Sequence, residues 1–179
     1  MNCLCDFKIR NKNRKVSLKE FISMFIFNPA FRVIYLFRLF QKYHHKPILG
    51  KLIKIIYILQ SNKFSIQLGD FTNIGEGLLL PHNGPIIINS SAKIGAMCII
   101  HPNVLVGGNR IHDGWPTIGD RVFIGNGAKI IGSINIGDNV FISPAAFITK
   151  DVPSDSVVGA GINNILKTSG GSNYVKLYQ

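Results

Sequence analysis

Aliphatic residues recur at every sixth position along much of the chain. Isoleucine holds this position six times in succession, at Ile118, Ile124, Ile130, Ile136, Ile142 and Ile148. A helix would repeat its apolar positions every three or four residues and a half-buried strand every second residue, so neither produces this period. A six-residue period is typical of a β-helix whose coils are built from short strands. The pattern therefore predicts a mainly β protein, a parallel β-helix of hexapeptide repeats.

The same period extends toward the N-terminus, and two kinds of small residue accompany it. Its earlier members are Val106, Ile100, Ile94 and Ile88, and a separate run holds Leu80, Ile74 and Leu68. Glycine often follows the aliphatic residue, and a small or β-branched residue often lies four positions after it. We expect the aliphatic side chains to fill a narrow prism, with glycine supplying positive φ and close backbone approach at the corners. A β-sandwich is disfavoured, because its strands recur at wider and less regular intervals.

The first interruption of the six-residue ladder lies between Leu80 and Ile88, where the step is eight residues. The additional residues fall in the segment PHNGP. We therefore expect His82, Asn83 and Gly84 to bulge from a corner of the prism.

The second interruption lies between Val106 and Ile118. The ladder position between them is His112, next to Asp113, and a histidine among charged residues does not fit an aliphatic column. The segment GGNRIHDGWP is therefore expected to leave the prism as a loop. Loops held by a rigid scaffold often carry function.

The first third of the chain is predicted to be helical. Ser17 and Glu20 form a capping-box pattern before an apolar run, Asn28 and Pro29 separate two helices, and Pro47 begins a third that extends to about Gln60. We divide the chain into a basic amphipathic helical region (1–63), a β-helix domain (64–163) and a C-terminal tail (164–179). The apolar runs are too short or too interrupted for a transmembrane span, and no signal peptide is recognisable.

The charge of the chain is concentrated in the helical region. The net charge is +11; residues 1–63 hold 13 Lys and Arg against two acidic residues, whereas residues 64–179 hold seven of each sign. Two interpretations remain open: a helical cap with solvated lysines, or a basic surface on an anionic membrane. Nucleic acid is disfavoured, because the basic residues alternate with large aliphatics and no nucleic-acid motif accompanies them. The three cysteines suggest free thiols in a reducing, cytoplasmic compartment, with possible peripheral contact at the inner membrane face.

An ordered set of motifs over roughly residues 64–160 resembles a known family. IGEGLLLPHNGPIIINSSAKIG, VLVGG, WPTIGD and VFIGNGAKIIGSINIGDNV are similar to the serine acetyltransferase branch of the hexapeptide acyltransferases. The resemblance implies a left-handed β-helix, a homotrimer, and acetyl transfer from acetyl-CoA to a hydroxyl group. The handedness comes from the family alone, because parallel crossovers are ordinarily right-handed.

The resemblance places the catalytic histidine at His82, in HNGP. A neutral imidazole there would take the proton of the acceptor hydroxyl as its oxygen attacks the thioester carbonyl. The sequence departs from the family pattern at two positions. Pro81 stands where the family has an aspartate that helps hold the amino acid, and Gln67 stands where a second aspartate orients the histidine. Asp70 and Glu76 are nearby in sequence and could replace that second aspartate.

The remaining candidate residues follow from the loop and from the family's acetyl-CoA cleft. Candidates for the acceptor site are His112, Asp113, Trp115, Asn83 and His101. Candidates for the cofactor site are Gly107, Gly108, Asn109, Asn126, Pro144 and Lys150. Trp115 could stack on a sugar ring or anchor the loop on the prism. No metal is expected.

The leading interpretation of these candidates is an acetyl-CoA-dependent O-acetyltransferase acting on a sugar hydroxyl of a surface polysaccharide or its precursor. The alternative is a serine O-acetyltransferase that produces O-acetylserine for cysteine biosynthesis. A non-catalytic scaffold and a metal-dependent hydratase are weaker alternatives. His82 in its bulge opposes the scaffold. The spacing of the histidines opposes the hydratase.

Overall fold

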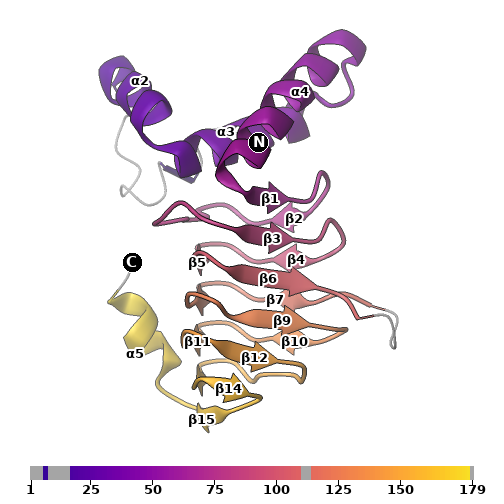
Figure 1. The fold of residues 1–179 in the computed structure, drawn as a ribbon. Coiled ribbons are helices and arrows are strands. Elements are labelled where there is room, and N and C mark those ends of the chain that lie inside the picture. The colour runs from indigo at the N-terminus through magenta and orange to yellow at the C-terminus, as the bar shows by residue number, and fades with distance from the viewer. Residues whose placement is uncertain (1–5, 8–16, 110–113, 178–179) are drawn as a thin grey trace.

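The computed structural model describes residues 6–7, 17–109 and 114–177, which form a prism of short parallel strands beneath a cap of helices (Figure 1). The helices are α2 (Leu18–Phe27), α3 (Pro29–Tyr43), α4 (Pro47–Phe64) and α5 (Gly171–Lys176). The strands are β1 (Ile66–Leu68), β2 (Asn73–Ile74), β3 (Ile86–Ile88), β4 (Lys93–Ile94), β5 (Ile99–Ile100), β6 (Val104–Gly107), β7 (Thr117–Ile118), β8 (Phe123–Ile124), β9 (Lys129–Ile131), β10 (Asn135–Ile136), β11 (Phe141–Ile142), β12 (Ala146–Ile148), β13 (Val157–Val158), β14 (Gly161–Ile162) and β15 (Ile165–Lys167).

The strands form three sheets, one on each face of the prism. Sheet A has the order β1-β3-β6-β9-β12-β14, sheet B the order β10-β7-β4-β2, and sheet C the order β15-β13-β11-β8-β5. The chain visits sheets A, B and C in turn and descends in a left-handed sense, as Figure 1 shows. The predicted mainly β, parallel β-helix of hexapeptide repeats with an N-terminal helical region is confirmed.

Equivalent ladder residues stack on one another in successive coils. Ile118 pairs with Ile94 on one side and Ile136 on the other, all in parallel register. The interior side chains are removed from solvent, and Ile124 and Ile130 are both 0% exposed. Burial of one such side chain contributes about 1.5–3 kcal/mol, so the repeated column provides the main apolar core of the prism.

The glycines that follow the ladder residues serve close approach, and the expectation that they supply positive φ was wrong. Positive φ occurs instead at other corner residues, such as Asn103 (62°), Arg121 (54°) and Asn139 (57°). At Gly95 a Cβ would lie 2.5 Å from the carbonyl atoms of Gly119 in the next coil. Most of these glycines are needed because stacked coils bring backbone against backbone, where no side chain fits; Gly107 is an exception.

Substitution of Gly95 by alanine is expected to lower the free energy of unfolding by about 1–3 kcal/mol, because the added methyl group would meet backbone atoms that cannot move without shifting a coil. Gly107 provides a matched control. It occupies the same ladder position, has no positive φ, and has nothing within 4 Å of a built Cβ. Urea denaturation of the two alanine variants measures the difference. Equal midpoints would contradict the assigned role of Gly95.

The cap helices begin and end much as the sequence predicts. The Ser17 hydroxyl accepts from the Glu20 amide and the Glu20 carboxylate accepts from the Ser17 amide, which completes the capping box. The Asn28 side chain caps α3, and α2 and α3 meet at 107°. α4 extends to Phe64, beyond the expected end near Gln60. Among the described residues, no single helix has the length and hydropathy of a membrane span. α2 and α3 reach that length and hydropathy only when they are taken together, and the pair is bent.

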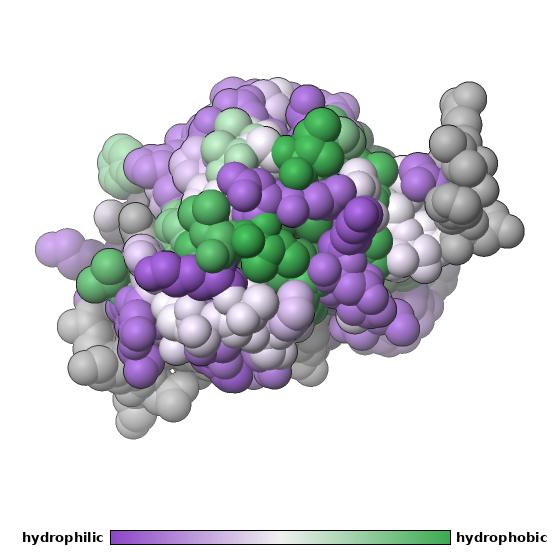
Figure 2. Space-filling model, turned by 90° about the horizontal axis from the view of Figure 1, so that it is seen from below, coloured by the Kyte–Doolittle hydropathy of each residue, from purple (hydrophilic) through white to green (hydrophobic). Residues whose placement is uncertain are grey.

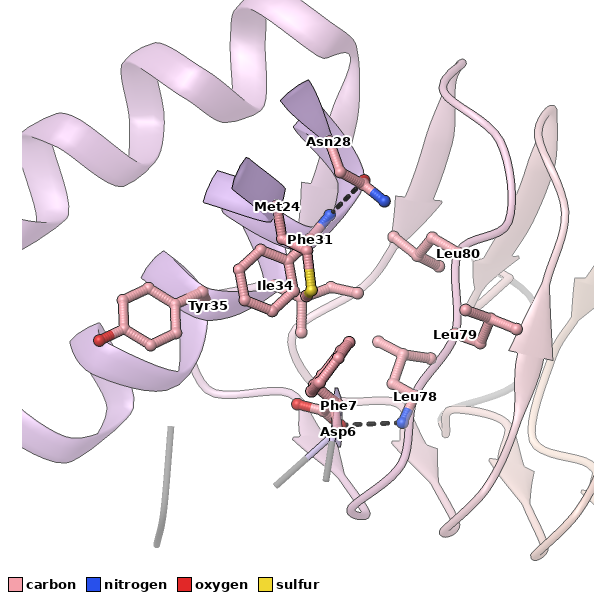
Figure 3. Close-up of a pocket in the computed structure, with 10 residues that line it drawn as sticks. All are labelled: Asp6, Phe7, Met24, Asn28, Phe31, Ile34, Tyr35, Leu78, Leu79 and Leu80. Atoms are coloured by element: carbon pink, nitrogen blue, oxygen red, sulfur yellow. Dashed lines mark hydrogen bonds between the residues drawn. The ribbon is translucent and has the colours of Figure 1, made fainter. Parts of the chain in front are cut away.

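A buried ion pair ties the N-terminal segment and α3 to the first coil. Arg38 is 0% exposed and donates to both carboxylate oxygens of Asp6, at 3.0 and 2.9 Å. Two further N–H groups of Arg38 donate to the carbonyls of Ile74 and Gly75 at 2.6 and 2.7 Å. The Leu78 amide donates to Asp6 at 2.8 Å, a bond drawn in Figure 3. Five hydrogen bonds thus link three segments that are distant in the sequence.

The residues after 163 close the far end of the prism and then return along sheet C. β15 pairs antiparallel with β13, and α5 packs on sheet C, where Val175 joins Ile99 and Phe123 in a small buried cluster. Ile162 and Leu166 remain exposed at this end (70% and 59%). Figure 2, which views the molecule from below, shows apolar patches among polar residues.

Asp155 holds the start of α5. Its carboxylate accepts from the amides of Gly170 and Ser172 at 2.8 and 2.7 Å, and these bonds, with minor help from Lys176, lower the pKa of Asp155 below its ordinary 3.8. The contribution of the ionised Asp155 carboxylate to the stability of the fold is therefore complete above pH 3.8. It is lost as the pH falls through the lower pKa that Asp155 has in the folded state. We expect hydrogen exchange at the amides of Gly170 and Ser172 to accelerate as the pH falls through the pKa of Asp155 in the folded state. In Asp155→Asn, which cannot titrate, the step should be absent; identical profiles for both proteins would contradict this.

Candidate active site

His82 lies on an exposed corner between sheets C and A. The connection from Leu80 to β3 carries it, and Leu79 of this segment bridges in parallel to Ile99 below. Gly84 adopts φ 148°, where a Cβ would lie 2.8 Å from the Pro102 side chain of the next coil. The PHNGP segment therefore bulges outward at this corner, as expected, and it presents His82 and Asn83 to solvent.

Beneath His82, ring side chains form a column along sheet C. The ring centroids of His82 and His101 lie 5.6 Å apart, and those of His101 and Phe123 lie 4.9 Å apart. The column continues through Phe141 to Tyr174 of α5, at 4.7 and 5.3 Å. Phe123 is only 4% exposed, so the middle of the column is fixed in the protein. His101 is thereby held against His82.

The environment of His101 favours its neutral form. Burial lowers the pKa of His101 below 6.5, and a positive charge on the neighbouring His82 lowers it further. At neutral pH a neutral His101 adds no positive charge beside His82. This suits a histidine that must accept a proton.

A second group of candidate residues lies where sheet A passes into sheet B. Gly107 ends β6, and Gly108, Asn109 and Lys150 lie in the corner connections on the same side of the prism. The Trp115 ring covers Gly108, where a Cβ would lie 2.8 Å from the indole, while 44% of the residue remains exposed. Trp115 therefore anchors the base of the loop on the prism and also presents an open surface. His112 and Asp113 fall outside the described residues.

The candidates thus form two groups on opposite edges of sheet A (Figure 1). His82, Asn83, His101, Asn126 and Pro144 lie at corners between sheets C and A, whereas Gly107, Gly108, Asn109, Trp115 and Lys150 lie at corners between sheets A and B. One sheet separates the groups within a chain. Asn126 and Pro144 lie in the coils below His82, and the Asn126 carbonyl accepts from the Ala145 amide at 2.9 Å.

The structure does not supply an orienting carboxylate for His82 among the described residues. Gln67 points outward from the middle of β1, and Asp70 forms an ion pair with Lys54 of α4. Within the same residues, no group of three or more His, Cys, Asp or Glu side chains could hold a metal ion. The contact that does reach the His82 ring comes from His101.

The ring column below His101 was missed in the sequence. Phe123 and Phe141 lie eighteen positions apart, and the parallel register of β8 and β11 pairs them directly. Three hexapeptides make one coil, so equal aromatic residues at that separation predict a stack. Tyr174 carries no such signal, because it follows the last coil.

A cavity beneath the cap helices lies away from these candidates. It measures about 230 Å³ and lies between the cap helices and the first coil (Figure 3). Its walls are mainly apolar and include Met24, Phe31, Ile34 and Leu80. No candidate catalytic or cofactor residue contributes to it.

Comparison with known proteins finds a hexapeptide-repeat match within the coils and similarity to serine acetyltransferases. Residues 116–150 match the model of the bacterial transferase hexapeptide (six repeats). The serine acetyltransferase of Helicobacter pylori (strain J99) is 36% identical over 105 residues, which cover 57% of this chain and 61% of the relative. Serine acetyltransferase 3 of Arabidopsis thaliana is 36% identical over 131 residues, 70% of this chain and 33% of the relative. The chain spans about half the length or less of several such relatives.

Solved structures agree on the fold. Serine acetyltransferase of Neisseria gonorrhoeae in complex with serine superposes with a TM-score of 0.71 at 26% identity, covering 89% of this chain and 65% of that one. Serine acetyltransferase of Brucella abortus in complex with coenzyme A gives 0.75 at 24% identity, covering 94% and 67%. The expected sugar acceptor of a surface polysaccharide is contradicted, because these relatives are serine acetyltransferases. The sugar interpretation relied on Trp115 as a stacking surface, whereas in the structure its ring packs on Gly108.

Proposed function

We propose that this chain is an acetyl-CoA-dependent O-acetyltransferase whose acceptor is the hydroxyl of L-serine. The observation that carries the proposal is the exposed His82 on the interrupted corner, in a chain whose curated relatives are serine acetyltransferases. Acetyl-CoA is the donor that those relatives imply, and the structure of one of them is described as a complex with coenzyme A.

In the proposed reaction, the neutral His82 imidazole accepts the hydroxyl proton while the serine oxygen attacks the thioester carbonyl. The tetrahedral intermediate collapses by breaking the carbon–sulfur bond, and the proton held by His82 passes to the departing thiolate. The products are O-acetylserine and coenzyme A. His101, neutral and held by Phe123, supports the His82 ring and keeps additional positive charge away from it.

The proposed enzyme works as a homotrimer. The two groups of candidates lie on opposite edges of sheet A, so residues of both groups cannot line one site within a single chain. A cyclic arrangement of parallel prisms would bring the His82 edge of one copy to the Trp115 edge of its neighbour. Acetyl-CoA would then lie in the cleft between them, near Gly107, Gly108 and Asn109 of one copy and Asn126 and Pro144 of the other.

The proposal is tested by measuring release of free coenzyme A thiol from acetyl-CoA in the presence of L-serine. L-alanine is the matched control, because it keeps the amino acid backbone and lacks the acceptor hydroxyl. We expect release with serine only, together with formation of O-acetylserine. Because Pro81 replaces an aspartate of the serine acetyltransferase pattern, we expect a high KM for serine. Equal, background release with both amino acids would overturn the proposed acceptor.

A further inference from the structure

Helix α4 buries one of its faces and leaves the opposite face open. The helix packs on α3 and β1, and its buried residues are Gly50, Ile53, Tyr57 and Ser61. The opposite face carries the outer stripe, which we define as Ile48, Leu52, Ile55 and Leu59. These four residues are 85%, 54%, 56% and 61% exposed. Figure 1 shows α4 rising from the top of the prism, with much of its length beyond the coils. The outer stripe therefore faces away from the elements on which α4 packs.

The outer stripe is the centre of a wider apolar surface. Its members are separated by four, three and four residues, so they lie along one line of a helix with 3.6 residues per turn. Leu49, Ile56 and Ile58 flank the stripe at about 40% exposure, which makes seven exposed aliphatic residues between positions 48 and 59. A continuous exposed surface of this kind marks a site of interaction. Because aliphatic side chains favour removal from water, its occupant should offer an apolar phase.

The charged residues beside this surface are all basic. α4 contains Lys51, Lys54 and Lys63 and no aspartate or glutamate. Lys54 forms an ion pair with Asp70, whereas Lys51 and Lys63 are exposed. At about 100° per residue, Lys51 lies about 60° to one side of Ile48 and Lys63 about 60° to the other. Each of these two lysines can lay its aliphatic stem on the apolar surface and extend its ammonium group to the rim.

The whole cap has the same sign of charge. Residues 1–63 have a net charge of +11, and Glu20 is the one acidic residue in the sequence from 17 to 64. If two copies met through their outer stripes, α4 would bring no acidic residue to offset its lysines. An anionic lipid membrane offers both an apolar phase for the aliphatic side chains and phosphate groups for the lysines. The charge of the cap therefore favours a membrane over a second copy of the chain.

We propose that the outer stripe binds α4 to the surface of an anionic lipid membrane. The aliphatic side chains lie at the boundary between headgroups and acyl chains, and Lys51 and Lys63 meet the lipid phosphates. α4 has 18 residues, so the contact is about 27 Å long. Apolar contact and charge act together, and stable attachment to a membrane requires two such signals. The proposal does not depend on the acetyl transfer proposed above, because no residue of this surface is a candidate for the active site.

The first test is flotation of the full-length protein with vesicles of phosphatidylglycerol and phosphatidylcholine. We expect the wild type to float with these vesicles and to stay in solution with vesicles of phosphatidylcholine alone. Ile55→Glu, which places a carboxylate in the stripe, should lose flotation. Ile162→Glu is the matched control and should float as the wild type does, because Ile162 is also an exposed isoleucine but lies at the opposite end of the prism. A wild type that stays in solution, or equal flotation of the two variants, would overturn the proposal.

The second test removes positive charge from the rim of the stripe. A lysine near an anionic membrane strengthens binding roughly fivefold, so Lys51→Gln combined with Lys63→Gln should weaken partition into the anionic vesicles roughly 25-fold. The matched control is Lys93→Gln combined with Lys167→Gln, which changes the net charge equally at exposed residues of β4 and β15. Salt screens lysines that lie far from the membrane, so the control should bind nearly as the wild type does. Equal weakening by both pairs would show attraction of the whole basic chain and would refute a site on α4.

The third test reports the surroundings of the stripe directly. Ile55→Cys is made with Cys3→Ser and Cys5→Ser, since the remaining Cys98 is buried, and is labelled with bimane. On the anionic vesicles its emission should shift to shorter wavelength, whereas the same label at Ile162→Cys should not shift. This measurement keeps the proposal falsifiable if Ile55→Glu fails to fold, because unshifted emission from vesicle-bound protein would contradict it. Light scattering after size exclusion should give Ile55→Glu the wild-type mass; a smaller mass would assign the stripe to contacts between copies and overturn the proposal.

Discussion

Replacing His82 with asparagine is expected to lower kcat for acetyl transfer by roughly 10²- to 10⁴-fold, the usual contribution of a general base. Asparagine keeps a polar side chain of similar length but cannot take the proton of the acceptor hydroxyl near neutral pH. The residue is exposed and packs on His101 only through its ring, so the fold should survive. Initial rates of coenzyme A release, measured at saturating serine and acetyl-CoA, give the change in kcat.

The matched control for this prediction is His45→Asn. His45 is also exposed, but it lies at the end of α3, away from both edges of sheet A. Its substitution should leave kcat within about a factor of two of the wild type. If His82→Asn retains full kcat with an unchanged assembly, the base is a different group and the mechanism proposed here is wrong.

Replacing Arg38 with alanine is expected to lower the free energy of unfolding by about 3–5 kcal/mol, the cost of leaving one partner of a buried ion pair without the other. The substitution removes both bonds to Asp6 and leaves the carbonyls of Ile74 and Gly75 without their donor. A typical domain is stable by only about 5–15 kcal/mol, so the loss is large. Urea denaturation followed by circular dichroism measures it.

Arg121→Ala serves as the control for Arg38. Arg121 is exposed and donates one hydrogen bond to Asn139 at 2.7 Å, so its loss should cost at most about 0.5 kcal/mol. A double-mutant cycle with Asp6→Ala then isolates the pair itself, and we expect the effects of Arg38→Ala and Asp6→Ala to be non-additive. Additive effects would show that the two residues stabilise the fold independently.

The fold could be predicted from the sequence because its apolar pattern has a period unlike that of ordinary helices and strands. Ile118 and its successors are buried where the period places them, and the break at Leu80 coincides with the exposed corner of His82. The roles at the corners could not be predicted. Gly95 is needed because the backbone of Gly119 in the next coil approaches it closely. This approach depends on how the coils stack, and the local sequence around Gly95 does not indicate it.

The arrangement of the candidate site could be predicted less well from the sequence. Trp115 and His82 both flank interruptions of the ladder, which suggested one site, but the order of the three sheets places them on opposite edges of sheet A. The partner of His82 is an aromatic column, whereas the family pattern led us to expect a carboxylate. The choice between acceptors needed the relatives, because an exposed indole fits a sugar and a loop anchor equally well.

The position of the second interruption bears on how such a protein can diversify. Gly108 and Pro116 leave and re-enter the prism at the same edge, and the pairs on either side, Val106 with Ile130 and Ile118 with Ile136, keep their register. Lengthening a surface connection costs little free energy, since its closure entropy grows only with the logarithm of its length. We therefore expect insertions between Gly108 and Pro116 to leave the stability of the coils nearly unchanged, so that the chain can vary in length at this position while the coils are retained.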